Sequence, residues 1–142
     1  MKKGSPIYCK CLYYSSGALA RIMTKLADET FSVVGLSSSF AFLLMTVNGK
    51  PGIQPKEISE HMLLTQSTVT RLIEKMEYRG FLERKQAGRT TEVYPTKQSL
   101  DIDNKIKEAW KNLYTKYTEI LGEDESNKLT SDIYGAVNKI EQ

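Results

Sequence analysis

Residues 64–84 of the 142-residue chain, LTQSTVTRLIEKMEYRGFLER, decide the fold. Thr65 is a residue type favoured at helix N-caps, and Gly80 is the type that most often follows a helix end. The stretch therefore predicts a helix over residues 66–79. At 100° per residue, its apolar side chains share one arc of about 100°, which is typical of a helix packed on a core: Val69, Leu72, Ile73 and Met76.

The opposite face of this predicted helix suits a nucleic acid. Short hydroxyl side chains near its start allow close approach to base edges or phosphates, and a helix N-terminus offers free N–H groups and a positive dipole end. Arg71 can reach a guanine edge or a phosphate. The face and its flank carry Ser67, Thr68, Thr70, Arg71, Glu74, Lys75, Tyr78 and Arg79.

The neighbouring segments predict a winged helix-turn-helix. Pro55 suits the first position of a short helix, which a tight connection at residues 63–65 joins to the helix above. Residues 81–85 and 91–95 predict two strands of a hairpin, with a polar tip that includes Arg89. In this order of elements the second helix enters the major groove, and we expect the hairpin to act as a wing that reaches an adjacent minor groove.

Long helices are predicted on both sides of this lobe. Residues 7–32 and 97–121 each carry apolar side chains at steps of three and four. A last helix, capped by Glu123 or Asp124, carries a similar seam. These three seams hold more apolar surface than one small lobe can cover.

One further helix remains between the first long helix and the lobe. Ser37 is its expected N-cap. The run over residues 40–45 is apolar all round, so a buried helix and a central strand both fit it, and we favour the helix because Leu, Met and Ala prefer it. The fold class expected is therefore mainly α with a small β-hairpin wing.

Composition excludes several classes of protein. The chain is 40% hydrophobic and 26% charged, which is ordinary for a globular domain. No apolar run reaches the roughly 18–20 residues of a membrane helix, and Lys10 interrupts the stretch after the basic start Met1-Lys2-Lys3, so no signal peptide is predicted. We expect a cytoplasmic protein with no membrane partner.

Catalytic and metal-binding motifs are missing from the sequence. Its one histidine, His61, and two cysteines give neither an HExxH motif nor a CxxC pair. No phosphate-binding glycine loop or GxSxG elbow occurs. We expect no enzyme, no metal and no cofactor.

Charge is segregated along the chain although the net charge is only +3. Residues 48–98 carry nine Lys or Arg against six acids, and residues 99–142 carry six against nine. The basic excess thus includes the predicted winged lobe, and the acidic excess lies in the C-terminal helices. A polyanionic partner for the lobe agrees with this pattern.

Residues 36–98 resemble the MarR family of transcriptional regulators, and the order of the other helices extends the likeness to nearly the whole chain. The stretch that carries it is residues 64–84, with Thr-Val-Thr-Arg, then Arg-Gly, an apolar pair and an Arg. Three positions depart from the family pattern. Leu63 stands where Gly is usual in the turn, Gln98 where Gly follows the second strand, and the tip around Arg89 lacks the family's acidic residues.

The resemblance implies that residues 1–142 form a single domain. It also implies that two copies of the chain form a homodimer. Residues 36–98 would form the DNA-binding lobe, and residues 5–34 and 99–142 would interleave as dimerisation helices. Such a dimer, expected to be a repressor, would place two recognition helices about 34 Å apart on a pseudo-palindromic operator in double-stranded DNA. The expected DNA-binding residues are Ser37, Gln66, Ser67, Thr68, Thr70, Arg71, Lys75, Arg79 and Arg89.

A small aromatic effector between the dimer helices and the lobe is also typical of the family. Its expected lining is Tyr13, Phe31, Phe40 and Trp110.

Two alternatives stay open at this point. Cys9 and Cys11 lie early in the first predicted helix, where one branch of the family senses organic peroxides, and a nearby tyrosine hydroxyl would lower the pKa of a thiol there. Two residues apart on a helix, the two thiols would point away from each other. The second alternative is a helical protein-interaction module that does not bind DNA.

Overall fold

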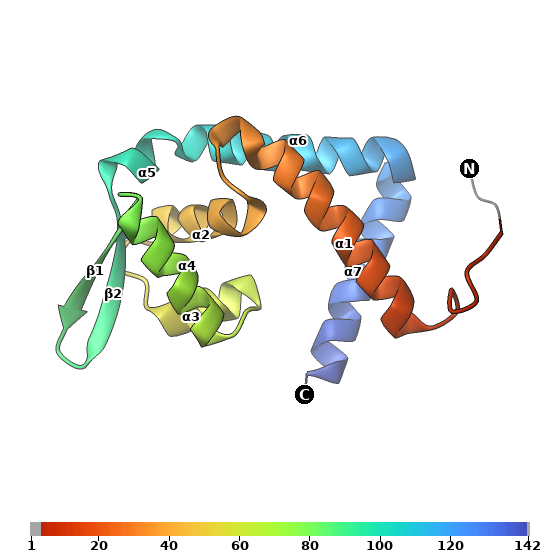
Figure 1. Cartoon of the computed structure of the whole chain (residues 1–142), viewed down its shortest axis with the longest axis horizontal. Helices are drawn as coiled ribbons and strands as arrows, with labels where there is room; N and C mark the ends of the chain where they lie inside the picture. Colours follow the sequence, from red (N-terminus) through yellow and green to blue (C-terminus); the bar gives the residue numbers. More distant parts are fainter. Residues whose placement is uncertain (1–3, 142) are drawn as a thin grey trace.

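The computed structural model describes residues 4–141 and confirms a mainly helical chain with one hairpin (Figure 1). Residues 1–3, which include the two lysines used in the signal-peptide argument, lie outside the described residues. In chain order the elements are α1 (Leu12–Phe31), the short 3-10 helix η1 (Ser32–Val34), α2 (Ser38–Gly49), α3 (Pro55–Met62), α4 (Gln66–Tyr78), β1 (Leu82–Ala87), β2 (Thr90–Pro95), α5 (Lys97–Asp101), α6 (Asp103–Leu121) and α7 (Glu123–Ile140).

The elements are arranged in two parts (Figure 1). Helices α2, α3 and α4 and the hairpin form a compact lobe on one side. Helix α6 runs from that lobe along one edge of the molecule to the other side, where α1 and α7 cross. Helix α1 therefore begins on the side of the molecule remote from the hairpin.

The core lies in the lobe and beneath α6. Helix α2 is central, because it contacts α1, α3, α4, α6 and β2. Its side chains Leu43, Leu44 and Val47 are fully buried, which confirms the buried helix expected from the apolar run. Among residues 4–141, every buried apolar side chain falls between Phe31 and Leu113.

The hairpin is longer than its sequence pattern predicts. Strands β1 and β2 pair antiparallel from Leu82 opposite Pro95 to Ala87 opposite Thr90, which leaves a two-residue tip of Gly88 and Arg89. Gly88 has φ 66°, a backbone conformation that glycine adopts without steric cost and that matches the twist of a two-residue hairpin.

Helix α1 begins five residues later than predicted. Residues 7–10 form turns, and Cys11 is the extended N-cap residue with φ −92° and ψ 122°. The Ser15 hydroxyl donates to the Cys9 carbonyl oxygen at 2.9 Å. A side chain thus satisfies a carbonyl group that precedes the helix, and no backbone N–H of α1 is needed for it.

The long helix predicted over residues 97–121 is interrupted at Ile102 and forms α5 and α6. The Asn48 amide, on α2, donates to the Ser99 carbonyl oxygen at 3.3 Å and to the Asp103 carboxylate at 2.9 Å. The Ser99 hydroxyl donates in turn to the Asn48 side-chain oxygen at 2.8 Å. Contacts from another helix thus satisfy the backbone and stabilise the break.

The N-cap position predicted at Ser37 is confirmed, whereas the cap predicted for the last helix is wrong. Ser37 occupies the N-cap position of α2, but the Asp28 carboxylate caps the helix, accepting from the Ser38 backbone N–H at 2.8 Å and the Ser38 hydroxyl at 2.7 Å. Helix α7 has Gly122 at its N-cap and no side-chain cap. Glu123 and Asp124 lie in its first turn, where the helix dipole favours negative charge.

No single helix in the described part of the chain is long and apolar enough to cross a membrane. One bent pair, Leu12–Val34 with Ser38–Gly49, meets the same length and composition criteria jointly, with a 62° bend between its halves.

Candidate nucleic-acid interface

Helix α4 is amphipathic in the way its sequence predicts. Val69 and Met76 are fully buried and Ile73 is nearly so, which fixes the helix on the lobe. Thr65 caps its start, since the Thr65 hydroxyl oxygen accepts from the Thr68 backbone N–H at 3.3 Å. The Thr65 hydroxyl also donates to the Thr68 hydroxyl at 2.9 Å, so Thr68 is part of the cap.

The turn between α3 and α4 holds the departure from the family pattern at Leu63. Leu63 has φ 56° and ψ 43°, the left-handed conformation that favours glycine. The backbone N–H groups of Leu63 and Leu64 both donate to the Ser59 carbonyl oxygen, which ends α3. The turn keeps the glycine-type geometry with a leucine, at a cost of about 1–2 kcal/mol.

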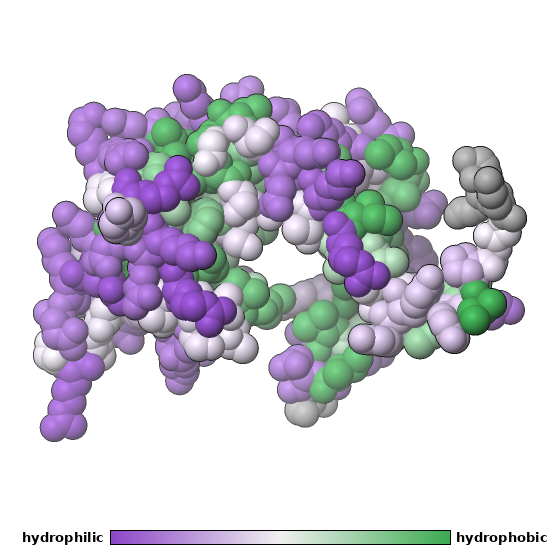
Figure 2. Space-filling model, viewed as in Figure 1, coloured by the Kyte–Doolittle hydropathy of each residue, from purple (hydrophilic) through white to green (hydrophobic). Residues whose placement is uncertain are grey.

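The outward face of α4 is polar, and Figure 2 shows this side of the lobe as hydrophilic. Gln66, Ser67, Arg71, Lys75 and Arg79 are all exposed, and Thr70 is half-buried. Tyr78, next to these cations, is 93% exposed, and sequence reasoning placed it on this face without assigning it a role. Hydroxyl, amide and basic groups are therefore presented together to solvent.

The basic side chains of this face are not neutralised by the protein. Within residues 4–141, no carboxylate oxygen lies within 4.0 Å of Arg71, Lys75, Arg79 or Arg89. The Arg79 guanidinium instead lies over the Phe81 ring, 5.5 Å from its centroid. These cations are available to phosphates, with which they form charge-assisted hydrogen bonds.

Arg84 has a different role that the sequence did not reveal. Its Nε and Nη2 atoms donate to Glu77 Oε1 at 3.1 and 2.8 Å, and its backbone N–H donates to Glu77 Oε2 at 3.3 Å. Glu74 lies 3.9 Å away from the same guanidinium. Arg84 thus joins the base of the hairpin to α4 and restrains the hairpin relative to that helix.

The wing carries Arg89 at its tip, where the side chain is exposed. Along the hairpin, the Lys85 ammonium lies over the Tyr94 ring at 4.9 Å from its centroid. The Tyr94 hydroxyl donates to Glu92 at 2.8 Å, and this hydrogen bond raises the pKa of Tyr94. Ser37, the remaining predicted DNA-binding residue, is exposed but lies at the start of α2, on neither α4 nor the wing.

The four residues predicted to line an effector pocket are not brought together. Phe31 is fully buried, Phe40 packs against the core, and Tyr13 is 86% exposed near the opposite end of α1. Trp110 is half-exposed on α6. Phe42, which sequence reasoning missed, links two of them, with its ring centroid 5.8 Å from Phe31 and 6.0 Å from Trp110.

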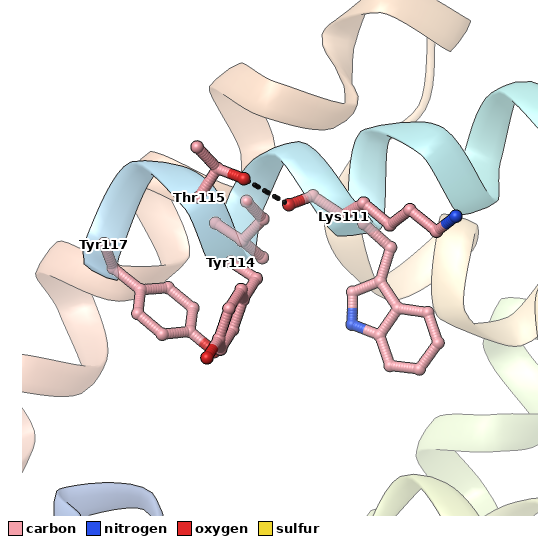
Figure 3. A pocket seen from close by; sticks show the side chains of 6 residues that line it. Lys111, Tyr114, Thr115 and Tyr117 are labelled. Carbon is pink, nitrogen blue, oxygen red and sulfur yellow. Dashed lines mark hydrogen bonds between the residues drawn. The ribbon is translucent and has the colours of Figure 1, made fainter. Parts of the chain in front are cut away.

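Two hollows lie along α6 beside this aromatic chain. One, of about 410 Å³, is lined by Trp110, Lys111, Leu113, Tyr114, Thr115 and Tyr117. Figure 3 shows the Tyr114 and Tyr117 rings side by side, pointing away from the helix axis, and their centroids are 5.5 Å apart. The other, of about 300 Å³, shares Leu113 and lies between α1, α2 and α3, lined also by Met23, Thr24, Ala27, Ser38, Ser39, Phe42, Met62 and Leu64.

The cysteines do not occupy the helix on which they were predicted. Cys9 lies in a turn and Cys11 is the N-cap residue of α1, and both are exposed free thiols. The argument that helix geometry separates them is therefore wrong. No side-chain hydrogen bond joins a tyrosine to either sulfur within the described residues, and peroxide sensing stays a prediction.

His61 lies on the exposed side of α3, with Nε2 3.5 Å from the Glu57 carboxylate. The hydrogen bond from Lys50 is the main cause that lowers the pKa of Glu57. Across residues 4–141 no group of three or more His, Cys, Asp or Glu side chains is placed to hold a metal ion.

Comparison with known proteins identifies this arrangement. Residues 36–87, from just before α2 to the end of β1, match the model of the MarR family. Over this stretch the chain is similar to the MarR family. MarR-family proteins are transcriptional regulators and not enzymes, in agreement with the expectation from the sequence.

Relatives with full-length similarity extend the match beyond the lobe. The HTH-type transcriptional regulator SarZ of Staphylococcus epidermidis is 22% identical over 134 residues, covering 92% of this chain and 86% of that protein. The structure of a MarR protein from Peptoclostridium difficile is 22% identical with a TM-score of 0.79, and covers 98% of this chain and 95% of that one. A mutant MarR from E. coli complexed with operator DNA is 17% identical with a TM-score of 0.79, covering 93% and 99% of the two chains. These structural likenesses show that the whole chain, including the terminal helices, has the MarR fold.

Proposed function

We propose that this chain is a sequence-specific regulator of the MarR family that binds double-stranded DNA through α4 and the wing. One observation carries the proposal: the outward face of α4 presents hydroxyls and unneutralised cations on a helix whose opposite face is fixed in the core. The N-terminal turn of α4 would contact base edges, and Arg71, Lys75 and Arg79 would contact phosphates or guanines. Residues 36–98 would form the DNA-binding lobe.

The working unit proposed is a homodimer assembled from residues 5–34 and 99–142. Its support is the apolar surface that these helices leave in solvent, including Leu12 at 71% exposed, Ile120 at 76% and Ile140 at 75%. A two-fold dimer would present two copies of α4 about one DNA turn, roughly 34 Å, apart and would bind a pseudo-palindromic operator. A dimer bound across a promoter would block access to that promoter, so we infer that the protein is a repressor. A DNA partner is in keeping with a cytoplasmic protein.

We further propose a small aromatic effector in the two hollows along α6. The hollow between α1, α2 and α3 is lined both by a terminal helix and by helices of the lobe. A molecule bound there would therefore favour one position of the lobe relative to the terminal helices. Trp110 and Phe42 supply aromatic rings for edge-to-face contact with such a ligand.

A titration of the full-length protein with the duplex upstream of its own gene tests this function. We expect a shifted complex that contains two chains per duplex, that survives excess unrelated duplex, and that weakens steeply as salt increases. Equal competition by the unrelated duplex would contradict sequence-specific recognition and favour the interaction-module alternative.

A further inference from the structure

The lobe is joined to the terminal helices at two places, and one of them is a polar junction. On one side η1 connects α1 to α2, and on the other α5 carries the chain from the hairpin to α6 (Figure 1). Helices α2, α5 and α6 contact one another at this second place. The angle between α4 and the long helix α6 therefore depends on how the junction of α2, α5 and α6 is held.

The side chain of Asn48 lies at the centre of this junction. Its three hydrogen bonds, two with Ser99 and one with the Asp103 carboxylate, all reach residues of α5 or α6 and none stays within α2. The amide nitrogen donates to two acceptors and the amide oxygen accepts once, so little of its hydrogen-bonding capacity is left for water. Ser99 is fully buried and Asn48 is half-buried, which shields these contacts from solvent.

The same junction is tied to the end of α4. The Thr96 hydroxyl, at the start of α5, donates at 2.7 Å to the carbonyl oxygen of Gly80, which lies two residues after α4. The Thr96 hydroxyl oxygen also accepts from the Ser99 backbone N–H at 3.4 Å. A continuous series of hydrogen bonds therefore runs from the end of α4 through Thr96, Ser99 and Asn48 to the first turn of α6.

The contact with Asp103 is the directional part of the attachment to α6. It joins an amide donor to a carboxylate at 2.9 Å, and such charge-assisted hydrogen bonds are stronger than neutral ones. Lys107, one turn further along α6, lies 2.9 Å from the other oxygen of the same carboxylate and helps to hold it in place. Burial of apolar side chains such as Ile106 is non-directional, whereas a hydrogen bond weakens steeply as its angle changes. Asn48 thus restrains the rotation of the lobe relative to α6.

We propose that Asn48 is a positioning residue that sets which spacing between DNA half-sites the protein accepts. This role rests on the proposed function, since it concerns the two α4 helices of a dimer bound to DNA. Each added base pair moves a half-site by about 3.4 Å and turns it by about 34°. A lobe held at one angle to α6 fits one spacing, whereas a lobe that is free to turn fits several spacings and has to be ordered at each of them.

Titration of the full-length protein with three duplexes tests this role. The duplexes are the one upstream of its own gene and two derivatives, with one base pair inserted at or deleted from the centre of the pseudo-palindrome. We expect the wild type to prefer the natural spacing by about tenfold or more, and Asn48→Ala to reduce this preference to about threefold or less. Asn104→Ala, which removes an exposed amide at the start of α6, is the matched control and should keep the wild-type preference to within about twofold.

The ratio of affinities separates positioning from stability. A variant that is only less stable loses affinity for all three duplexes by the same factor, which leaves the ratio unchanged, and urea unfolding measures that loss separately. Asp103→Ala removes the α6 part of the contact and keeps the pair of Asn48 with Ser99, so it should also narrow the preference. If Asn48→Ala does not fold, Asp103→Ala with the same control decides the question.

An unchanged ratio in the Asn48 variant would overturn the inference and leave the proposed function intact. The same holds if the wild type binds the three duplexes equally but still rejects an unrelated duplex, or if Asn104→Ala narrows the preference as much as Asn48→Ala does. A wild type that binds the unrelated duplex as tightly as the natural one would contradict the proposed function itself, and this inference with it.

Discussion

The winged lobe and the terminal helices use their apolar residues in opposite ways. In the lobe, α2 and α4 each bury most of their aliphatic side chains, as at Leu44 and Ile73. In α7 no apolar side chain is fully buried, and in α1 only Phe31, at the end nearest the lobe, is. Figure 2 shows the result, with hydrophobic residues at the surface of the remote end and hydrophilic ones over the lobe.

This difference indicates which part of the chain is complete by itself. The lobe holds its own core, and its polar surface is free to bind DNA. The terminal helices are amphipathic, and much of their apolar surface has no packing partner within the described part of the chain. In the proposed dimer, a second copy of the chain would cover these faces under two-fold symmetry. Each prediction below alters one side of this comparison.

The largest effect is expected in the core of the lobe. Ile73→Ala removes a side chain that is 1% exposed and should lower the free energy of unfolding by about 2–5 kcal/mol, through lost burial and the cavity left behind. Urea unfolding followed by circular dichroism measures this loss. A loss below about 1 kcal/mol would mean that the lobe is not the packed unit described.

A charge on α7 should act on assembly and not on the lobe. Ile133→Asp places a carboxylate on the apolar face of α7. Burying this carboxylate in a dimer would remove its hydrating water, and we expect dimerisation to become less favourable by about 1–3 kcal/mol. We expect sedimentation equilibrium to show that the dimer dissociates into monomers. Circular dichroism should show that the chain keeps its helical content. Asn138→Asp adds the same charge at an exposed position of α7 and should leave the dimer intact.

The link between α4 and the wing should matter more for recognition than for stability. Glu77→Gln weakens a charged contact that is one-third exposed, so the stability loss should stay below about 1 kcal/mol. The wing would lose its fixed orientation, and we expect operator affinity to fall several-fold. Unchanged affinity would show that Arg84 does not position the wing.

The smallest effect concerns acid stability of α3. Lys50 lowers the pKa of Glu57 from its usual 4.5, so the pair stabilises the lobe above pH 4.5, and this contribution is lost as the pH falls through the lowered value. Lys50→Gln should therefore move the Glu57 titration, followed by NMR, towards 4.5. Glu57 is ionised at neutral pH in both proteins, so the pH midpoint of acid unfolding should rise only slightly in the variant. An unshifted Glu57 titration would contradict the conclusion that Lys50 lowers the pKa of Glu57.

Local signals explain what could be predicted from the sequence. The Thr65 cap, Pro55 at the start of α3 and the apolar arc of α4 depend on residues close together in the chain, and all are confirmed. The left-handed turn at Leu63 could not be predicted, because sequence alone does not show whether a leucine keeps the conformation of a glycine.

Contacts between distant residues explain what was missed. The break at Ile102 depends on Asn48, about fifty positions earlier, and α2 is capped by Asp28 from another helix. The Glu77–Arg84 contact spans a helix end and a strand, so no periodicity reveals it. For the predicted effector lining, residue type alone did not show that Phe31 is buried while Tyr13 is exposed in the single chain.

A salt series of operator titrations on wild type, Arg71→Ala and Lys105→Ala tests the central claim that α4 binds DNA. Lys105 is exposed at the start of α6, outside the proposed interface, so its variant controls for the loss of one positive charge. The account predicts that Arg71→Ala loses about 1–3 kcal/mol of binding free energy and lowers the slope of log affinity against log salt by about one, while Lys105→Ala matches the wild type. Equal affinities and slopes for all three proteins would contradict it.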